Sequence, residues 1–265
     1  MFKGYQNFDY GQIHYLTAGD TGPSIVLLHE SPLSNRVFEK CIPALSEWAQ
    51  VFAPDTPGYG NSDALAKSST LADYAKVIGE SIKLWAGDRQ VLICGTHTGA
   101  SLAIELVNQF PNIASGLFLI GVPFYTEAES SDRIANWCPD IEITEEGEHL
   151  NWAWRRYQKI WPTAPLLDRN MAVLDMLSVS DKYNWGYLQA FNYAVGDRIK
   201  NVNCALRISA AENEFLFAGS KRLAEQINAD FTVFAGLDGQ VPLRAPDLFS
   251  EELKKFHESL TGIAK

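Results

Sequence analysis

A single histidine stands where an apolar strand gives way to a helix. His97 follows the continuously apolar run 90–94 and precedes the helical pattern 99–110, and Gly95 and Gly99 lie two residues away on either side. In open α/β sheets ligands bind at the carboxyl ends of the strands, so a side chain at this junction is well placed for chemistry. Because imidazole titrates near neutrality, His97 can act as a base, an acid or, less often, a nucleophile.

The other histidines and the cysteines give weaker signals. His29 ends a central strand, whereas His14, His149 and His257 are expected at the surface or in satisfied hydrogen bonds. The four cysteines lie far apart without a C-x-x-C pair, so neither a zinc site nor a disulfide framework is indicated. We therefore expect no metal and no cofactor.

The elements that must position His97 follow from an alternation of short apolar runs with longer helical patterns. Strands are expected at residues 12–17, 24–29, 50–54, 90–94, 116–121, 205–210 and 231–234. Helices are expected at residues 36–49, 71–85, 99–110, 217–228 and 246–260. This order predicts an α/β protein with a doubly wound, mostly parallel sheet.

Residues 123–196 interrupt the alternation with a helical and unusually aromatic pattern. We interpret this stretch as an inserted helical lid over the active end of the sheet, within a single domain that spans residues 1–265. Its rings would line a substrate cavity, with Trp154 as a candidate contact, although any one of them could instead pack the lid onto the core. Five tryptophans lie in it: Trp137, Trp152, Trp154, Trp161 and Trp185.

Three segments resemble the α/β-hydrolase superfamily. Residues 15–32 look like its first strands and oxyanion loop, and residues 55–63 are similar to its D-x-x-G-x-G-x-S turn. Residues 94–101 take the place of its G-x-S-x-G nucleophile elbow, with both glycines kept and His97 in place of the serine. The resemblance implies the α/β-hydrolase fold, with the sharp backbone turn of the elbow retained.

The resemblance also implies where the rest of a catalytic triad would lie. Glu214 matches the position of the family's acid, and Gln240 stands where its general-base histidine belongs, so a Ser-His-acid triad cannot be assembled. We expect a relay instead. In it the Gln240 amide donates to Glu214 and accepts from one ring N–H of His97, which leaves the other ring nitrogen free as a base.

An oxyanion site is expected to survive, because backbone N–H groups build it. The resemblance assigns these groups to Thr98 and Glu30, and it gives His29 the role of supporting the loop by hydrogen bonding. Among the nearby hydroxyls, Ser31 comes closest to replacing the missing nucleophile. The Glu30 carboxylate could lower anion affinity, turn to solvent, or pair with His97 and raise its pKa.

Charge and composition restrict the partners. The net charge of −10 comes from 32 acidic and 22 basic residues, which argues against nucleic acid and anionic membranes as partners. The densest basic run, residues 154–159, fits a solvated helix face. No signal peptide or membrane span is evident, so we expect a cytoplasmic protein, a monomer or homodimer, that binds a small-molecule substrate or ligand.

Two functions remain open from the sequence. The first is a cofactor-free enzyme that acts on a small, largely apolar or aromatic carbonyl compound with His97 as base, by water activation, proton abstraction or retro-aldol cleavage. The second is a catalytically inactive small-molecule binding protein that kept the pocket. A free ring nitrogen of His97 in an aromatic cavity would favour the first. A His97 saturated by Glu30 and Gln240 in a filled site would favour the second.

Overall fold

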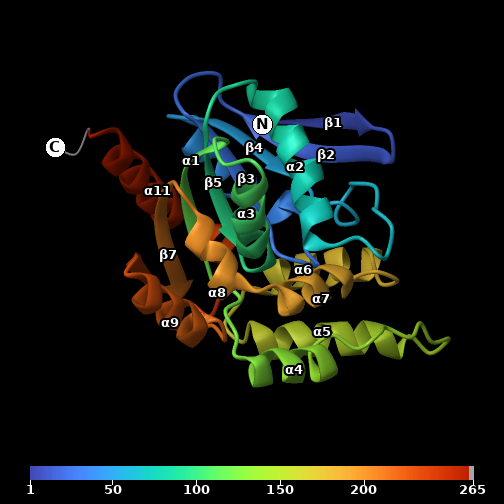
Figure 1. Cartoon of the computed structure of the whole chain (residues 1–265). Coiled ribbons are helices and arrows are strands. Elements are labelled where there is room, and N and C mark those ends of the chain that lie inside the picture. The colour runs from blue at the N-terminus through green and yellow to red at the C-terminus, as the bar shows by residue number, and fades with distance from the viewer. Residues whose placement is uncertain (263–265) are drawn as a thin grey trace.

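One eight-stranded sheet forms the centre of the molecule in the computed structural model, which describes residues 1–262 (Figure 1). Its strand order is β1-β2-β4-β3-β5-β6-β7-β8. The pairs β1–β2 and β2–β4 are antiparallel, and the remaining pairs are parallel. The strands are β1 (Phe2–Phe8), β2 (Gly11–Ala18), β3 (Ser24–Leu28), β4 (Gln50–Pro54), β5 (Val91–Thr96), β6 (Ala114–Ile120), β7 (Ala205–Ala211) and β8 (Asp230–Phe234).

The expected strands are all present, and one further strand was not expected. Strand β1 pairs only with β2 and lies at the edge of the sheet, where most of its side chains are exposed or half-buried. Its sequence therefore lacks the apolar run that marks a central strand. The buried strands β3 and β5 carry that run, as their central places require.

Helices cover both faces of the sheet, because successive side chains of a strand point to opposite sides. On β3, Ile25 and Leu27 belong to the hydrophobic cluster that includes residues of α1 and α11, whereas Val26 and Leu28 belong to the cluster that includes residues of α2, α3 and α9. These helices and their short neighbours are η1 (Asn35–Phe38), α1 (Ile42–Ser46), α2 (Leu71–Ala86), α3 (Thr98–Gln109), α9 (Phe217–Ile227), α10 (Val241–Arg244) and α11 (Pro246–Thr261).

The prediction of a single helix over residues 36–49 is wrong, because this stretch forms two short helices, η1 and α1. Pro43 lies in the first turn of α1. Proline lacks the N–H that an α-helix interior needs, so it fits a helix start and interrupts a longer helix.

The chain between β6 and β7 forms a separate group of helices, which we call the helical insertion. Figure 1 shows α4–α7 together at one end of the sheet, beyond the tip of the β7 arrow. A capping box of Thr126 and Glu129 starts its first helix. Its elements are α4 (Glu127–Asn136), α5 (Glu148–Ile160), α6 (Leu166–Ser178), α7 (Trp185–Asn192), α8 (Val195–Arg198) and η2 (Ile199–Asn201).

Among the described helices, none combines the length and the apolar character that crossing a bilayer would require.

Candidate active site

His97 forms the sharp turn between β5 and α3. Its backbone has φ 48° and ψ −113°, a conformation that costs free energy in any residue with a side chain. The flanking glycines make the turn possible, because a Cβ atom on Gly95 would lie 2.4 Å from the Gly99 carbonyl oxygen. A Cβ atom on Gly99 would lie 2.2 Å from the carbonyl oxygen of Leu28. The chain thus holds His97 at the carboxyl end of a central strand.

A buried carboxylate contacts the ring of His97 directly. The distance between His97 Nε2 and Glu214 Oε2 is 2.7 Å, and Glu214 Oε1 accepts a hydrogen bond from the Ala211 N–H at 2.9 Å. Both oxygens of the carboxylate are therefore fixed. Gly121 leaves room for the ring, since a Cβ atom there would lie 2.4 Å from His97 Cδ2.

The relay predicted from the sequence is wrong at Gln240. At 2.7 Å, His97 and Glu214 leave no space for an amide between them, and no hydrogen bond joins the Gln240 side chain to either residue within residues 1–262. Gln240 nevertheless lies in the same cavity as His97, with the left-handed backbone angles φ 55° and ψ 47°. Gln240 thus lies near His97, but the only side chain that hydrogen-bonds the His97 ring within residues 1–262 is the Glu214 carboxylate.

The second ring nitrogen of His97 makes no hydrogen bond to any described side chain or backbone group. A carboxylate can only accept, so we assign the proton of the neutral ring to Nε2 and the lone pair to Nδ1. Burial lowers the pKa of His97, but the charge and hydrogen bond of Glu214, with a smaller contribution from Glu30, raise it overall above its ordinary value of 6.5. Nδ1 is therefore a strengthened base.

The loop after β3 lies beside His97 and contains Glu30 and Ser31. The Thr96 hydroxyl donates to Glu30 Oε2 at 2.8 Å, whereas the buried Oε1 has no hydrogen-bond partner among the described residues. The Ser31 N–H donates to the Thr98 hydroxyl oxygen at 2.6 Å, and that hydroxyl donates to Ser31 Oγ at 3.2 Å. The Thr98 N–H, as the first of helix α3, has no acceptor within the helix.

His29 connects this loop to the neighbouring strand. Its Nδ1 lies 3.0 Å from the Glu30 carbonyl oxygen, and its Nε2 accepts the Thr56 N–H at 2.9 Å. Both ring nitrogens are occupied, with Nε2 as acceptor and Nδ1 as donor. This position makes it a support of the loop and leaves it no lone pair for a substrate.

His97 opens into a small inner cavity of about 30 Å³, lined by Glu30, Ser31, Thr98, Gln240 and mainly aromatic side chains. This volume accommodates a water molecule or two. All but one of the aromatic residues come from the helical insertion; Phe215 follows Glu214. The aromatic lining consists of Tyr125, Trp137, Tyr157, Trp161, Tyr187, Phe191 and Phe215.

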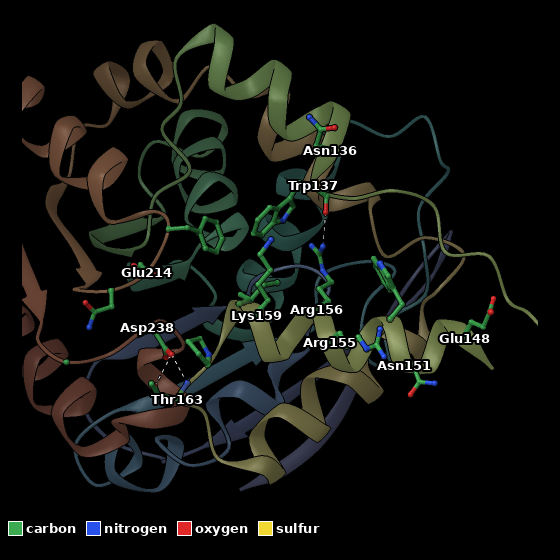
Figure 2. A pocket seen from close by; sticks show the side chains of 16 residues that line it. Asn136, Trp137, Glu148, Asn151, Arg155, Arg156, Lys159, Thr163, Glu214 and Asp238 are labelled. Atoms are coloured by element: carbon green, nitrogen blue, oxygen red, sulfur yellow. Dashed lines mark hydrogen bonds between the residues drawn. The ribbon is translucent and has the colours of Figure 1, made fainter. Parts of the chain in front are cut away.

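A larger outer cavity of about 1050 Å³ adjoins the inner one (Figure 2). The two share three wall residues, Trp137, Ile160 and Phe215. One wall of the outer cavity is helix α5, whose side chains at i, i+3, i+4 and i+7 lie on one face. These side chains are Trp152, Arg155, Arg156 and Lys159.

Trp154 lines neither cavity, which contradicts the expectation that it contacts a substrate. Its ring packs against the core, and the guanidinium carbon of Arg169 lies 5.6 Å from the ring centre. The helical period explains the difference, because residue 154 points away from the face that carries residues 152, 155, 156 and 159. That spacing in the sequence could have identified Trp152 and the cationic wall.

Within residues 1–262, no group of three His, Cys, Asp or Glu side chains lies close enough together to bind a metal ion.

The strand order and the turn at His97 can now be compared with known proteins. No family model matches the chain. A solved structure, the bromoperoxidase from Bacillus anthracis, superposes with a TM-score of 0.79 at 16% identity, over 97% of this chain and 100% of that one. The chain has the α/β-hydrolase fold. The fold class predicted from the sequence is confirmed.

Two curated relatives extend the comparison to the sequence level. The chain is 31% identical over 154 residues to a soluble epoxide hydrolase of Corynebacterium sp., which covers 58% of this chain and 51% of the relative. It is 28% identical over 103 residues to a haloalkane dehalogenase of Mesorhizobium japonicum, which covers 39% of this chain and 33% of the relative. The matches thus span between a third and half of the relatives' length, and they support the α/β-hydrolase superfamily.

Proposed function

We propose that this α/β-hydrolase-fold chain is a cofactor-free hydrolase that uses His97 as a general base on small, largely apolar or aromatic carbonyl compounds. One observation carries the proposal. His97 lies at the strained β5–α3 turn with Nε2 bound to the buried Glu214, while Nδ1 has no partner among the described residues. Of the two functions left open by the sequence, a free ring nitrogen beside an aromatic cavity favours the enzyme.

The step we propose is direct addition of water to the carbonyl carbon. As the water oxygen attacks, one water proton passes to Nδ1 of His97, and the Glu214 carboxylate stabilises the imidazolium that forms. The carbonyl electrons move onto its oxygen, which the Thr98 N–H and the N-terminus of α3 stabilise. Collapse of the adduct expels the leaving oxygen, which takes the proton back from Nδ1. The ring is then neutral again, and no acyl-enzyme forms.

Hydrolysis is preferred over proton abstraction for two reasons. One of the two curated relatives carries the name of a hydrolase, the soluble epoxide hydrolase. The inner cavity beside His97 also has room for a water molecule. In this proposal the helical insertion acts as the lid, because it supplies most of the aromatic lining and separates the site from bulk water.

The test is a screen of the purified chain against short-chain aryl esters, epoxides and β-dicarbonyl compounds, with His97→Ala, Ser31→Ala and His257→Ala assayed in parallel. Loss of a general base costs typically 10²–10⁴-fold in rate, so His97→Ala should lose turnover by roughly that factor. His257→Ala is the control, because His257 lies on α11, away from both cavities.

The Ser31→Ala variant distinguishes general-base catalysis by His97 from nucleophilic attack by Ser31. Ser31→Ala should keep most of the activity, whereas its complete loss would make Ser31 the nucleophile and overturn the proposal. Full activity in His97→Ala would overturn it as well. No turnover on the whole panel, with tight binding of aromatic compounds, would identify the chain as the inactive binding protein.

A further inference from the structure

The α5 wall of the outer cavity contains three cationic side chains that no carboxylate neutralises. Arg155, Arg156 and Lys159 face this cavity, and none of them forms an ion pair with an Asp or Glu in the described part of the chain. Figure 2 shows Lys159 and Arg156 side by side below Trp137. In a chain of net charge −10, such a concentration of positive charge is unusual.

The guanidinium of Arg156 has one edge bound and one edge free. Its Nη1 donates to the Trp137 carbonyl oxygen at 2.8 Å. Its Nε and Nη2 atoms are buried and make no well-formed hydrogen bond among residues 1–262, and the Tyr187 hydroxyl lies in polar contact with the guanidinium. These two nitrogens form the side-on edge of the guanidinium, whose parallel N–H groups match the two oxygens of a carboxylate. An unpaired buried donor of a charged group is costly, which indicates that a ligand completes it.

Aromatic rings hold this guanidinium in place. Its central carbon lies 5.0 Å from the ring centre of Trp137, 5.6 Å from that of Trp152 and 5.8 Å from that of Tyr187. Burial raises the pKa of the Tyr187 phenol, and the charge of Arg156 together with the polar contact between the two side chains partly offsets this rise. Since Trp137 and Tyr187 also line the inner cavity, Arg156 lies next to the space that leads to His97.

The acidic side chains around the outer cavity are already engaged or distant from Arg156. Glu214 is bound to His97 and the Ala211 N–H. Asp238 accepts hydrogen bonds from Thr163 at 3.0 Å and 2.9 Å and pairs with Arg244. Glu148 begins helix α5, two turns before Arg156, and makes no ion pair with it.

We propose that the outer cavity binds a carboxylate group of the substrate on the Nε–Nη2 edge of Arg156, with Arg155 and Lys159 attracting it at the rim. The substrates are then apolar or aromatic carbonyl compounds that also carry a carboxylate. With the carboxylate on Arg156, the apolar part extends past Trp137 and Phe215, and the carbonyl reaches His97. This assignment of a substrate class rests on the function proposed above, whereas binding of a carboxylate at Arg156 does not require turnover.

The test is therefore a binding measurement. Tryptophan fluorescence, to which Trp137 and Trp152 in the cavity wall contribute, reports titrations of the chain with 3-phenylpropionate and with 3-phenylpropanamide, its neutral counterpart. A hydrogen-bonded charged pair predicts that the carboxylate binds at least about tenfold tighter than the amide. Arg156→Gln should abolish this preference, whereas Arg89→Gln, at an exposed arginine that lines neither cavity, should leave it unchanged.

Each outcome is decisive. Equal binding of the two probes to the unmodified chain overturns the proposal, as does a preference that survives in Arg156→Gln. Arg156→Lys provides a second test if the glutamine variant fails to fold. It keeps the positive charge but removes the two parallel N–H groups of the Nε–Nη2 edge. It should bind the carboxylate several-fold more weakly than the unmodified chain, and unchanged affinity would overturn the proposal. A carboxylate preference in a chain without turnover would leave Arg156 assigned and refute only the hydrolase.

Discussion

At the scale of single residues, the site contains a pair of interacting side chains, His97 and Glu214. The resemblance to the α/β-hydrolases had suggested a third partner, Gln240. The ring of His97, which lines the inner cavity, is oriented by Glu214 through one nitrogen, and the other nitrogen has no hydrogen-bond partner among the described residues. Gln240 lines the same inner cavity as His97 without taking part in the pair. A histidine bound to a buried carboxylate is a stronger base than free imidazole, because the negative charge stabilises its protonated form.

This pairing predicts the pH dependence of the proposed reaction. Since the pKa of His97 is raised above 6.5, the base is protonated and inactive at lower pH, and kcat/KM should rise with pH through a value above 6.5. Glu214→Gln removes the charge that raises this pKa, so the rise should move to lower pH while the maximal rate falls. The pH profile of kcat/KM for both forms measures the shift.

Glu212→Gln is the matched control, since Glu212 lies two residues earlier and accepts the Gly236 N–H instead of touching His97. Its profile should coincide with that of the unmodified chain. An unshifted profile in Glu214→Gln would show that Glu214 does not set the pKa of the base.

At the scale of elements, the β5–α3 turn depends on close contact between the start of α3 and strand β3. Gly99 is the point of contact, as its Cα faces the carbonyl oxygen of Leu28. The backbone on both sides is fixed by sheet and helix hydrogen bonds, so neither can move away easily. The position of His97 is therefore determined by how tightly helix and sheet pack.

This contact predicts that Gly99→Ala destabilises the chain. The added methyl group would lie 2.2 Å from a backbone oxygen, and overpacking of this kind costs typically about 1–3 kcal/mol of unfolding free energy. Urea denaturation followed by circular dichroism measures the loss.

Ser101→Ala serves as the control in the same helix. The Ser101 hydroxyl is buried without a hydrogen-bond partner among the described residues, so its removal should leave stability unchanged or slightly higher. Equal stability of Gly99→Ala and the unmodified chain would mean that helix α3 can shift from β3 without cost.

At the scale of the whole molecule, the His97–Glu214 pair links catalysis to stability. It joins residues 117 positions apart, from the ends of β5 and β7, and so exists only in the folded chain. A histidine whose folded pKa is raised stabilises the fold below its unfolded pKa, and this contribution disappears as the pH rises through the folded pKa.

The comparison of the unmodified chain with His97→Gln tests this link. Both side chains bear the same backbone strain at position 97, so the strain cancels from the difference. The unmodified chain should show its largest advantage in unfolding free energy near about pH 6, and this advantage should shrink towards about pH 9. Urea denaturation across this range measures it, and a constant difference would mean that His97 is not charged in the folded state.

Features that depend on local patterns could be predicted from the amino-acid sequence. Apolar runs and helical periods identified the central strands and the four long helices that cover the sheet, and the glycines around His97 identified the turn, because backbone conformation follows from neighbouring residues. The exposed edge strand β1 escaped detection because its side chains carry no such pattern.

Which side chains contact one another depends on how the helices and strands pack in three dimensions. The sequence placed Glu214 and Gln240 near His97, yet only packing settled that the carboxylate reaches the ring and the amide does not. Likewise, the cationic side chains of α5 line a cavity because the helical insertion packs at the end of the sheet. Contacts between distant segments depend on the relative placement of whole elements, within fractions of an ångström, and no local pattern encodes that placement.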